Sequence, residues 1–344
     1  MTCKAQAQVL DQKLSALFLL PLSSSLGPSH LERVSAFMAK HPPAGVIFMQ
    51  GTLPLQAQAI ERLEELSKGL PSAPLLYCQD AEFGLGMRLK DVPPLPKAPL
   101  LGKLSDEELL LAGLELGREC RLGGIHLNFA PVVDIYNNSA NLLMQNRCYG
   151  SDPEAVARAG VLMVRGMQQA GVMACAKHFP GHGDTAVDSH HDLPLLDHSL
   201  ERLKTVEWVP FRALIAAGVE AVMVGHLACL AIDPSGRPSS LSKPVIDLLR
   251  EELGFAGLVV TDALNMGALE NHFTPEEIAV QAFEAGADLL LYTTFSDEDQ
   301  MRRLYEETIP RALEGLKQAL LSGRIQETAL DEKLVRIAAI KTKI

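Results

Sequence analysis

Histidines are concentrated in one segment of the 344-residue chain, from Lys177 to just beyond Pro194. Five of the ten histidines lie between His178 and His198, and the string KHFPGHGDTAVDSHHDLP also contains glycines and prolines that favour a loop. Imidazole titrates near neutral pH, and it is also a common metal ligand. The segment therefore predicts acid–base catalysis, a metal site or a solvated polar loop.

The residues alone leave these interpretations open. A metal site would use four of the histidines: His178, His182, His190 and His191. Their spacing matches no familiar ligand pattern. An acid–base site would use His190, because Asp188 stands two residues before it and can fix the ring tautomer and raise its basicity. A purely solvated loop is disfavoured, since such loops seldom concentrate histidine.

Further polar residues follow short apolar runs along the chain. A charged side chain at the end of a buried run is costly unless it is paired or functional. For any one residue, an ion pair or a helix cap is the alternative, but several together favour a shared polar site. The residues are Asp80, Glu82, Asp134, Lys177, His178, His226 and Asp262.

The elements that carry these residues alternate between apolar runs and helical patterns. Eight apolar runs have the length and composition of strands buried on both faces: 14–22, 44–49, 74–79, 125–134, 172–180, 221–226, 257–262 and 287–292. Helical patterns lie between them, for example at 105–122, 152–170, 200–217, 243–253 and 275–285. Ser105 and Thr274 have the composition of N-caps, and several patterns end on glycine.

Eight strands separated by helices predict an α/β fold, a (β/α)₈ barrel of the TIM type. A doubly wound open sheet is the alternative, but no GxGxxG follows an early strand. The tail Asp299–Ile344 predicts two helices around a turn at Gly323, packed on the outside of the barrel. Residues 1–344 are thus expected to form a single domain, with its chemistry at the carboxyl ends of the strands.

Composition narrows the classes of partner. The net charge of −11 without a basic stripe argues against nucleic acid. No run approaches a membrane span, and the apolar run Leu14–Leu22 is short and follows Asp11, which argues against a signal peptide. The six cysteines form no CxxC pair, and several lie in apolar runs, which favours reduced thiols and a cytoplasmic location.

Several segments, in chain order, resemble the signatures of glycoside hydrolase family 3, specifically its single-domain bacterial β-N-acetylhexosaminidase branch. The loop Lys177–Pro194 is similar to KHFPGHGxTxxDSHxxLP, and Gly254–Asp262 to GFxGxVxSD. Further resemblances are Asp80–Arg88 to DQEGGxVxR, Leu127–Asp134 to NFAPVVD and Asn146–Pro153 to NRSFGxDP, and the segments Ala285–Asp288 and Ser322–Ile325 also fit the family. Because the match extends in order along most of the chain, chance resemblance is excluded.

The resemblance implies roles for individual residues. Asp262 corresponds to the catalytic nucleophile, His190 to the acid/base and Asp188 to the residue that orients His190. Another set corresponds to the residues that hold the non-reducing N-acetylglucosamine: Asp80, Arg88, Arg147, Lys177 and His178. The barrel's own loops are expected to supply the acid/base, whereas two-domain β-glucosidases of the family carry it on a second domain.

Two positions depart from the family pattern. Phe83 replaces a glycine of the EGG segment, which is expected to alter the backbone approach to the sugar or to fill a pocket wall. Thr261 stands where serine is common. The roles of Phe83, His191 and His226 stay open at this point.

The resemblance implies a retaining exo-β-N-acetylglucosaminidase that acts on terminal β-linked N-acetylglucosamine of peptidoglycan fragments, without a metal or an organic cofactor. The expected partner is a small carbohydrate, a muropeptide or disaccharide ending in β-linked N-acetylglucosamine, and the expected state is a monomer or weak dimer. Within the family, a phosphorylase and a β-glucosidase are the alternatives. A metal-dependent hydrolase built on the loop histidines and a non-catalytic sugar-binding barrel are alternatives from other classes.

Overall fold

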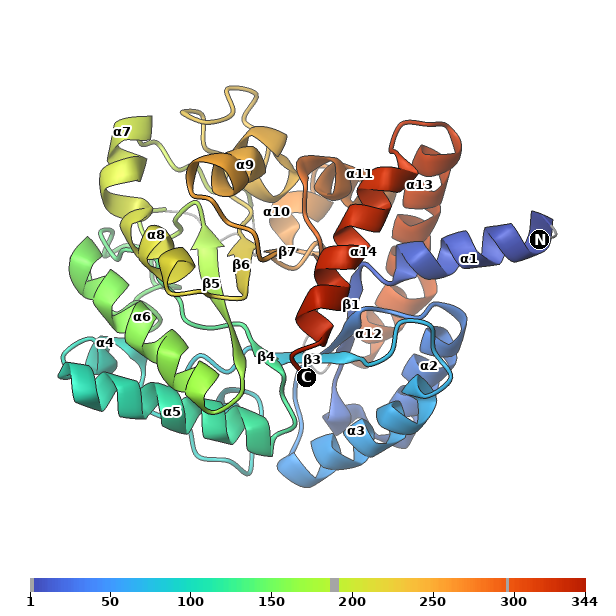
Figure 1. Cartoon of the computed structure of the whole chain (residues 1–344), viewed down its shortest axis with the longest axis horizontal. Helices are drawn as coiled ribbons and strands as arrows, with labels where there is room; N and C mark the ends of the chain where they lie inside the picture. The colour runs from blue at the N-terminus through green and yellow to red at the C-terminus, as the bar shows by residue number, and fades with distance from the viewer. Residues whose placement is uncertain (1–2, 186–191, 295–296) are drawn as a thin grey trace.

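The computed structural model describes residues 3–185, 192–294 and 297–344. Within these residues, eight parallel strands are ordered β7-β6-β5-β4-β3-β2-β1-β8. A bridge between Val260 and Leu289 joins β7 to β8. The sheet therefore closes into a barrel surrounded by helices, which confirms the predicted (β/α)₈ fold (Figure 1).

Every predicted apolar run contains one strand of the barrel. The strands are β1 (Phe18–Leu22), β2 (Gly45–Phe48), β3 (Leu76–Gln79), β4 (Leu127–Asn128), β5 (Met173–Phe179), β6 (Ala221–Val224), β7 (Leu258–Thr261) and β8 (Leu290–Leu291). All their residues are buried. One face of the sheet packs inside the barrel and the other beneath the helices, which explains the continuous apolar runs.

Strands β4 and β8 are shorter than their apolar runs, and side chains add hydrogen bonds beside both of them. The Asn128 side chain accepts from the N–H of Ala81 and donates to its carbonyl, both at 3.0 Å. Near β8, the Leu291 N–H donates to Thr261 Oγ1 at 3.1 Å. Both contacts tie neighbouring strands together where the regular ladder ends.

Helices surround the strands. They are α1 (Cys3–Ser15), α2 (Gly27–Lys40), α3 (Leu53–Ser67), α4 (Ala98–Leu101), α5 (Asp106–Leu122), α6 (Pro153–Gln169), α7 (Leu200–Arg202), α8 (Val209–Ala216), α9 (Lys243–Asp247), α10 (Gly267–Glu270), α11 (Pro275–Ala285), α12 (Glu298–Arg303), α13 (Ile309–Leu321) and α14 (Glu327–Lys341). Helices α5, α6, α7, α9 and α11 begin within one residue of the predicted helical patterns. Ser105 and Thr274 form capping boxes at the starts of α5 and α11, as predicted.

The first apolar run was predicted as one strand over Leu14–Leu22, and this boundary is wrong. Residues up to Ser15 belong to α1, and β1 starts only at Phe18. Leu14 lies in the last turn of α1 and is buried in the core. A buried helix end followed at once by a buried strand produces one continuous apolar run, so its length concealed the boundary.

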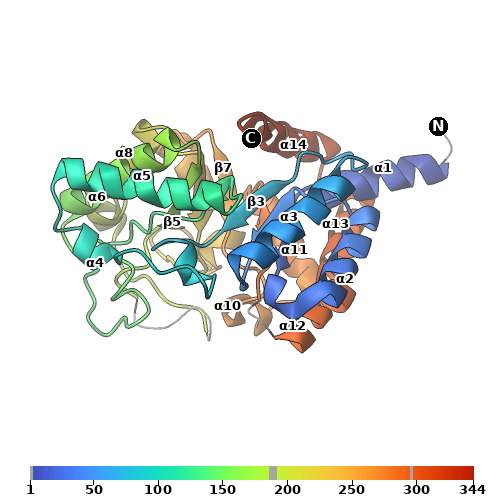
Figure 2. The same ribbon diagram turned by 90° about the horizontal axis from the view of Figure 1, so that it is seen from below.

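The tail forms helices around a turn at Gly323, and its last helix takes a place that the sequence did not predict. Helix α13 packs on α11 at the outside of the barrel. Helix α14 instead crosses the end of the barrel opposite to α10 and α12 (Figure 2). There Lys333 Nζ donates to the carbonyl of Ala287, which precedes β8, at 2.8 Å. Among the described residues, no helix combines the length and apolar character needed to cross a bilayer.

Candidate active site

A pocket of about 400 Å³ lies at the carboxyl ends of the strands. In a barrel of parallel strands these ends all face the same side, so residues far apart in sequence converge. The five candidate sugar-binding residues and the candidate nucleophile all line this pocket: Asp80, Arg88, Arg147, Lys177, His178 and Asp262. The structure thus brings together all the predicted site residues that it describes.

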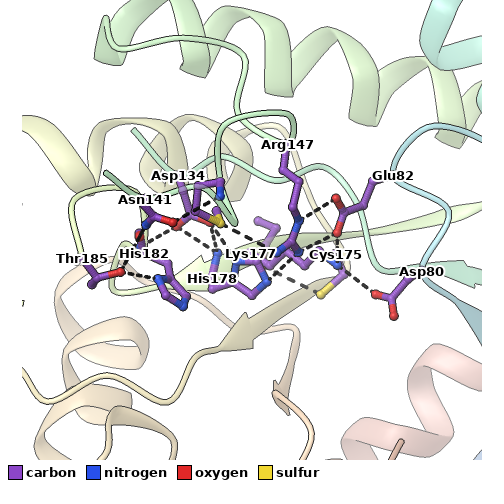
Figure 3. A network of polar contacts seen from close by, with 12 residues as sticks. Asp80, Glu82, Asp134, Asn141, Arg147, Cys175, Lys177, His178, His182 and Thr185 are labelled. Atoms are coloured by element: carbon purple, nitrogen blue, oxygen red, sulfur yellow. Dashed lines mark hydrogen bonds and ion pairs between the residues drawn. The ribbon is translucent and has the colours of Figure 1, made fainter. Parts of the chain in front are cut away.

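Two carboxylates and three cations form one network at the side of β3 and β5. Figure 3 shows its members Asp80, Glu82, Arg147 and Lys177. Lys177 Nζ lies 2.8 Å from Asp80 Oδ1 and 2.8 Å from Glu82 Oε1. Arg88 Nη2 donates to Asp80 Oδ2 at 2.7 Å. Arg147 donates from Nε and Nη2 to the two oxygens of Glu82, at 2.9 and 2.7 Å. Paired donors of this kind fix both partners, so the network is ordered before any sugar binds.

Burial divides the network into an inner and an outer part. The side chains of Lys177 and Glu82 are 2% and 6% exposed, whereas those of Asp80 and Arg147 are 17% and 19% exposed. Asp80 and Arg147 are therefore the members best placed to meet sugar hydroxyls. Lys177 also lines the pocket, and its ammonium lies between the two carboxylates; its predicted role in holding the sugar stays a prediction.

The cations keep both carboxylates ionised. Burial alone would raise the pKa of Asp80, but Lys177 and Arg88 outweigh it and hold the pKa below its ordinary value. In the same way Arg147 and Lys177 outweigh burial and lower the pKa of Glu82. Both side chains are therefore hydrogen-bond acceptors at neutral pH.

Asp134 fixes the orientation of His178. Its Oδ2 lies 2.8 Å from His178 Nδ1 and accepts the His178 backbone N–H at 3.1 Å, and its Oδ1 accepts the His182 backbone N–H at 2.6 Å. His178 Nδ1 therefore carries the proton, and Nε2 accepts from Arg147 Nη2 at 3.3 Å. The sequence left the role of Asp134 open, and the structure shows that it orients the ring.

Asp262 follows β7, and its carboxylate is held by the turn that comes next. Asp262 Oδ1 accepts the Ala263 N–H at 2.8 Å. The fully buried His226 donates from Nε2 to the Ala263 carbonyl at 2.9 Å, and its Nδ1 accepts from Ser240 Oγ at 2.7 Å. Burial acts to raise the pKa of Asp262, but His178, His226 and the Ala263 N–H outweigh it and lower the pKa to about 2. The carboxylate is thus ionised, as a nucleophile must be.

The predicted acid/base and its partner, His190 and Asp188, lie outside the described residues, as does His191. The described residues on either side of them are tied to each other. His198 Nε2 lies 2.9 Å from Asp184 Oδ2, and Arg202 Nη2 lies 3.5 Å from the same oxygen. These contacts hold both flanks of the segment together beside the barrel.

Some pocket residues were missed in the sequence. Glu82 was recognised only as a polar residue at a strand end, although its place in the segment that resembles DQEGG was an available signal. Asn265 lies three residues after Asp262, lines the pocket and donates from Nδ2 to the Thr293 carbonyl at 2.6 Å. Gln300 reaches the pocket from α12 and carried no sequence signal, because its role depends on how the tail packs.

Phe83 does not fill a wall of this pocket. Its ring lies beneath the Lys97 ammonium, 5.4 Å from Nζ to the ring centroid, and its carbonyl accepts the Leu95 N–H at 2.8 Å. The described residues that line the pocket do not include it. Of the two alternatives for Phe83, filling a wall is not met in this pocket, and an altered backbone approach to the sugar stays a prediction.

Of the four histidines proposed as metal ligands, His178 and His182 lie in the described part of the chain, and His190 and His191 lie outside it. In residues 3–185, 192–294 and 297–344, no group of three or more His, Cys, Asp or Glu side chains has the geometry to hold a metal ion. The His178 and His182 rings face each other edge-on with centroids 5.8 Å apart. His182 Nδ1 is engaged by Thr185 Oγ1 at 2.7 Å.

The chain is similar to several known proteins. Beta-hexosaminidase LpqI of Mycobacterium tuberculosis is 33% identical over 288 residues, which cover 81% of this chain and 71% of LpqI. Beta-hexosaminidase A of Pseudoalteromonas piscicida is 33% identical over 241 residues, covering 67% of this chain and 40% of that protein. The solved structure of a glycoside hydrolase family 3 beta-N-acetylglucosaminidase from Paenibacillus sp. superposes with a TM-score of 0.89 at 39% identity, covering 97% of this chain and 62% of that one.

The chain spans less than two thirds of the length of two of these three proteins. The model of the glycosyl hydrolase family 3 N terminal domain matches residues 9–340, nearly the whole chain. A family match of this extent agrees with the barrel and with the pocket at its strand ends. The chain therefore belongs to glycosyl hydrolase family 3, a family of glycoside hydrolases.

Proposed function

We propose that this protein hydrolyses the bond of a terminal, non-reducing β-linked N-acetylglucosamine with retention of configuration. The observation that carries the proposal is Asp262, an ionised carboxylate held at a strand end in the same pocket as the Asp80–Lys177–Glu82 network. The names of the relatives, beta-hexosaminidase and beta-N-acetylglucosaminidase, support this choice of sugar.

The mechanism that we propose has two steps. In the first, an Asp262 oxygen attacks the anomeric carbon while the bond to the leaving oxygen breaks, and His190 donates its proton to that oxygen. In the second, His190 takes a proton from water, whose oxygen attacks the anomeric carbon and releases Asp262. Two displacements restore the original configuration. Asp188 would orient His190. The residues that would hold the sugar are Asp80, Arg88, Arg147, Lys177 and His178.

The arrangement of the pocket supports separate roles for the network, which would bind the sugar, and for Asp262, which would attack it. The network on the β3 and β5 side offers fixed donors and acceptors, which grip hydroxyl groups with direction. Such gripping places the anomeric carbon in one position relative to Asp262, which lowers the entropy cost of attack. The substrates that we propose are peptidoglycan fragments, such as N-acetylglucosamine linked to anhydro-N-acetylmuramic acid.

Two substitutions test the mechanism on nitrophenyl β-N-acetylglucosaminide. Asp262→Asn keeps the shape but removes the nucleophile, and kcat is expected to fall by at least about 10³-fold. His190→Ala is expected to lose less on this activated leaving group than on a natural disaccharide, because a good leaving group needs little protonation. In that variant a glycosyl–enzyme should accumulate, seen as a mass increase on Asp262.

The matched control is Asp247→Asn, which changes an exposed carboxylate on α9 that pairs with Lys243. Its kinetic constants should equal those of the wild type. Equal and small losses in Asp262→Asn and His190→Ala would contradict the mechanism. Product analysis with and without phosphate distinguishes hydrolysis from phosphorolysis, and comparison with nitrophenyl β-glucoside distinguishes the sugar. Loss of activity after exhaustive chelation would favour the metal-dependent alternative.

We also propose that the protein works in the cytoplasm. Among the described side chains, five cysteines are buried free thiols: Cys78, Cys120, Cys148, Cys175 and Cys229. Thiols without disulfides are typical of a reducing compartment. Fractionation of cells that express the tagged protein tests this proposal, and recovery outside the cytoplasm would contradict it.

A further inference from the structure

A cavity of about 650 Å³ lies at the end of the barrel opposite to Asp262. Its walls come from α1, from the segment 71–74 before β3, and from α14. Figure 2 shows α14 on the side of the molecule away from α10 and α12, which lie at the active-site end. The proposed reaction uses none of the residues of this cavity, which we call the α14 cavity.

The walls of the α14 cavity are mostly apolar. Its apolar lining includes Val9, Ala16, Pro74, Leu334, Ile337 and Ile344. The volume falls in the range of cavities that hold small organic molecules. Exposed apolar walls of this extent gain free energy when an apolar body displaces water from them.

A buried cation lies in this apolar setting. Lys341 lines the cavity and is only 9% exposed, and its Nζ donates to the Ser72 carbonyl at 2.6 Å. No carboxylate among the described residues pairs with it. By contrast Lys13, which also lines the cavity, pairs with Glu327 and Asp331. Burial lowers the pKa of Lys341 to about 8, so the ammonium form is retained at neutral pH without an anionic partner.

A second polar group, the Ser72 hydroxyl, belongs to the residue whose carbonyl accepts from Lys341. Ser72 Oγ is shielded from solvent and makes no hydrogen bond to the described residues. Shielded polar atoms are normally paired, so each such atom requires an explanation. An ammonium with spare donors and a free hydroxyl on the residue that it contacts together form a place for an anionic oxygen.

We propose that the α14 cavity binds an amphipathic carboxylate. The carboxylate would accept hydrogen bonds from Lys341 Nζ and Ser72 Oγ, and the apolar body would lie against α1 and α14. A monoanion matches the single unpaired cation. A phosphate dianion would meet excess negative charge, because Lys13 of the cavity wall is paired with two carboxylates, Glu327 and Asp331.

Calorimetric titration of the full chain with decanoate, and with decanol as the neutral probe of equal length, tests this inference. Lys341→Met keeps the apolar stem and removes the charge, and it is expected to weaken decanoate binding at least 10-fold without changing decanol binding. Ser72→Ala should weaken decanoate binding about 3-fold, since it removes one neutral hydrogen bond. Lys343→Met is the matched control, because Lys343 is half exposed and pairs with Glu220; it should leave binding unchanged.

Several results would overturn the inference. Decanoate that binds no more tightly than decanol to the wild type would show that the cation is not used. If Lys341→Met and Lys343→Met weakened decanoate binding equally, the effect would come from the net charge of the protein and not from a contact with Lys341. Sedimentation that reveals a dimer lost in Lys341→Met, without decanoate binding, would assign the cavity to a second copy of the chain. Hydrolysis of nitrophenyl β-N-acetylglucosaminide should be normal in all three variants, so this test is independent of the proposed function.

Discussion

At the scale of single residues, the charges of the pocket balance. Among the described residues that line it, three cations face three carboxylates: Arg88, Arg147 and Lys177 against Asp80, Glu82 and Asp262. Burial acts to raise the pKa of Asp262, but His178, His226 and the Ala263 N–H outweigh it, with a smaller contribution from Lys177 of the network. Described residues alone therefore account for the ionised form of Asp262, the proposed nucleophile.

His226 is predicted to position the nucleophile without touching the substrate. His226→Ala removes the donor that holds the Ala263 carbonyl, so the Ala263 N–H no longer aims at Asp262. We expect kcat to fall by about 10²-fold with little change in KM, because misplacement of a reacting group costs rate more than binding. Since His226 helps to lower the pKa of Asp262, the acid limb of the kcat profile should move to higher pH.

Ser240→Ala serves as the control for this prediction, because it removes only the hydroxyl that donates to His226 Nδ1. Its loss in kcat should be much smaller, with the acid limb near the wild-type position. A role of His226 in stability alone would lower the unfolding midpoint of His226→Ala but leave the pH profile of the folded enzyme unchanged. That outcome would contradict the positioning role.

At the scale of elements, the sequence predicted most of what lies along the chain. Ser105 and Thr274 predicted the starts of α5 and α11, because a capping box is a local pattern of four residues. Asp80 and Asp262 were predicted as site residues because they follow buried apolar runs. A charged side chain in that position is costly unless it is paired or functional. The partner of each cation was not predictable, since the pairing of Arg147 with Glu82 joins loops 65 residues apart. The place of α14 depends on packing as well, and no local pattern encodes it.

The junction of β3 and β4 is predicted to weaken in mild acid. His126 Nδ1 accepts the Tyr77 N–H at 3.1 Å, and the two rings stack with centroids 5.0 Å apart. Burial, with a contribution from Arg121, lowers the pKa of His126 to about 4. The folded state therefore prefers the neutral ring, so the stabilisation is complete above the ordinary pKa of 6.5 and is lost as pH falls toward 4.

Burial lowers the pKa of His30 and His182 to about 4 as well, so they act in the same pH window. Each histidine contributes at most about 1.4 kcal/mol per pH unit to the decline of the unfolding free energy. His126→Asn supplies an oxygen that can accept the Tyr77 N–H but cannot be protonated. Urea unfolding at pH 7.5, 6.5 and 4.5 should show a shallower decline in this variant. A decline identical to that of the wild type would contradict the assignment.

At the scale of the whole molecule, the contact between β7 and β8 closes the barrel, and we call this contact the seam. The carboxylate of Asp288, on the β8 side, binds the backbone of β7 across it. Asp288 is fully buried, and its Oδ2 accepts the Val259 N–H at 2.8 Å. Arg250 binds the same oxygen at 2.6 Å, and Arg336 of α14 binds Oδ1 at 2.7 Å. The seam, the strand β7 that leads to Asp262, and the helix across the barrel end are thus joined through one side chain.

Asp288→Asn is predicted to lower the unfolding free energy of the barrel and to leave the catalytic constants nearly unchanged. The substitution leaves Arg250 and Arg336 partly buried without a counter-charge, and breaking such a pair costs about 3–5 kcal/mol in unfolding free energy. The exposed pair Lys243–Asp247 is the matched comparison, since Asp247→Asn should cost less than about 1 kcal/mol. Denaturant unfolding measures both losses.

Because Asp288 precedes β8 and lies away from the pocket residues at the other end of the strands, kcat and KM of the folded variant should stay close to those of the wild type. A large loss of kcat at full folding would show that the seam sets the position of Asp262, and closure and catalysis would then be one property of this barrel.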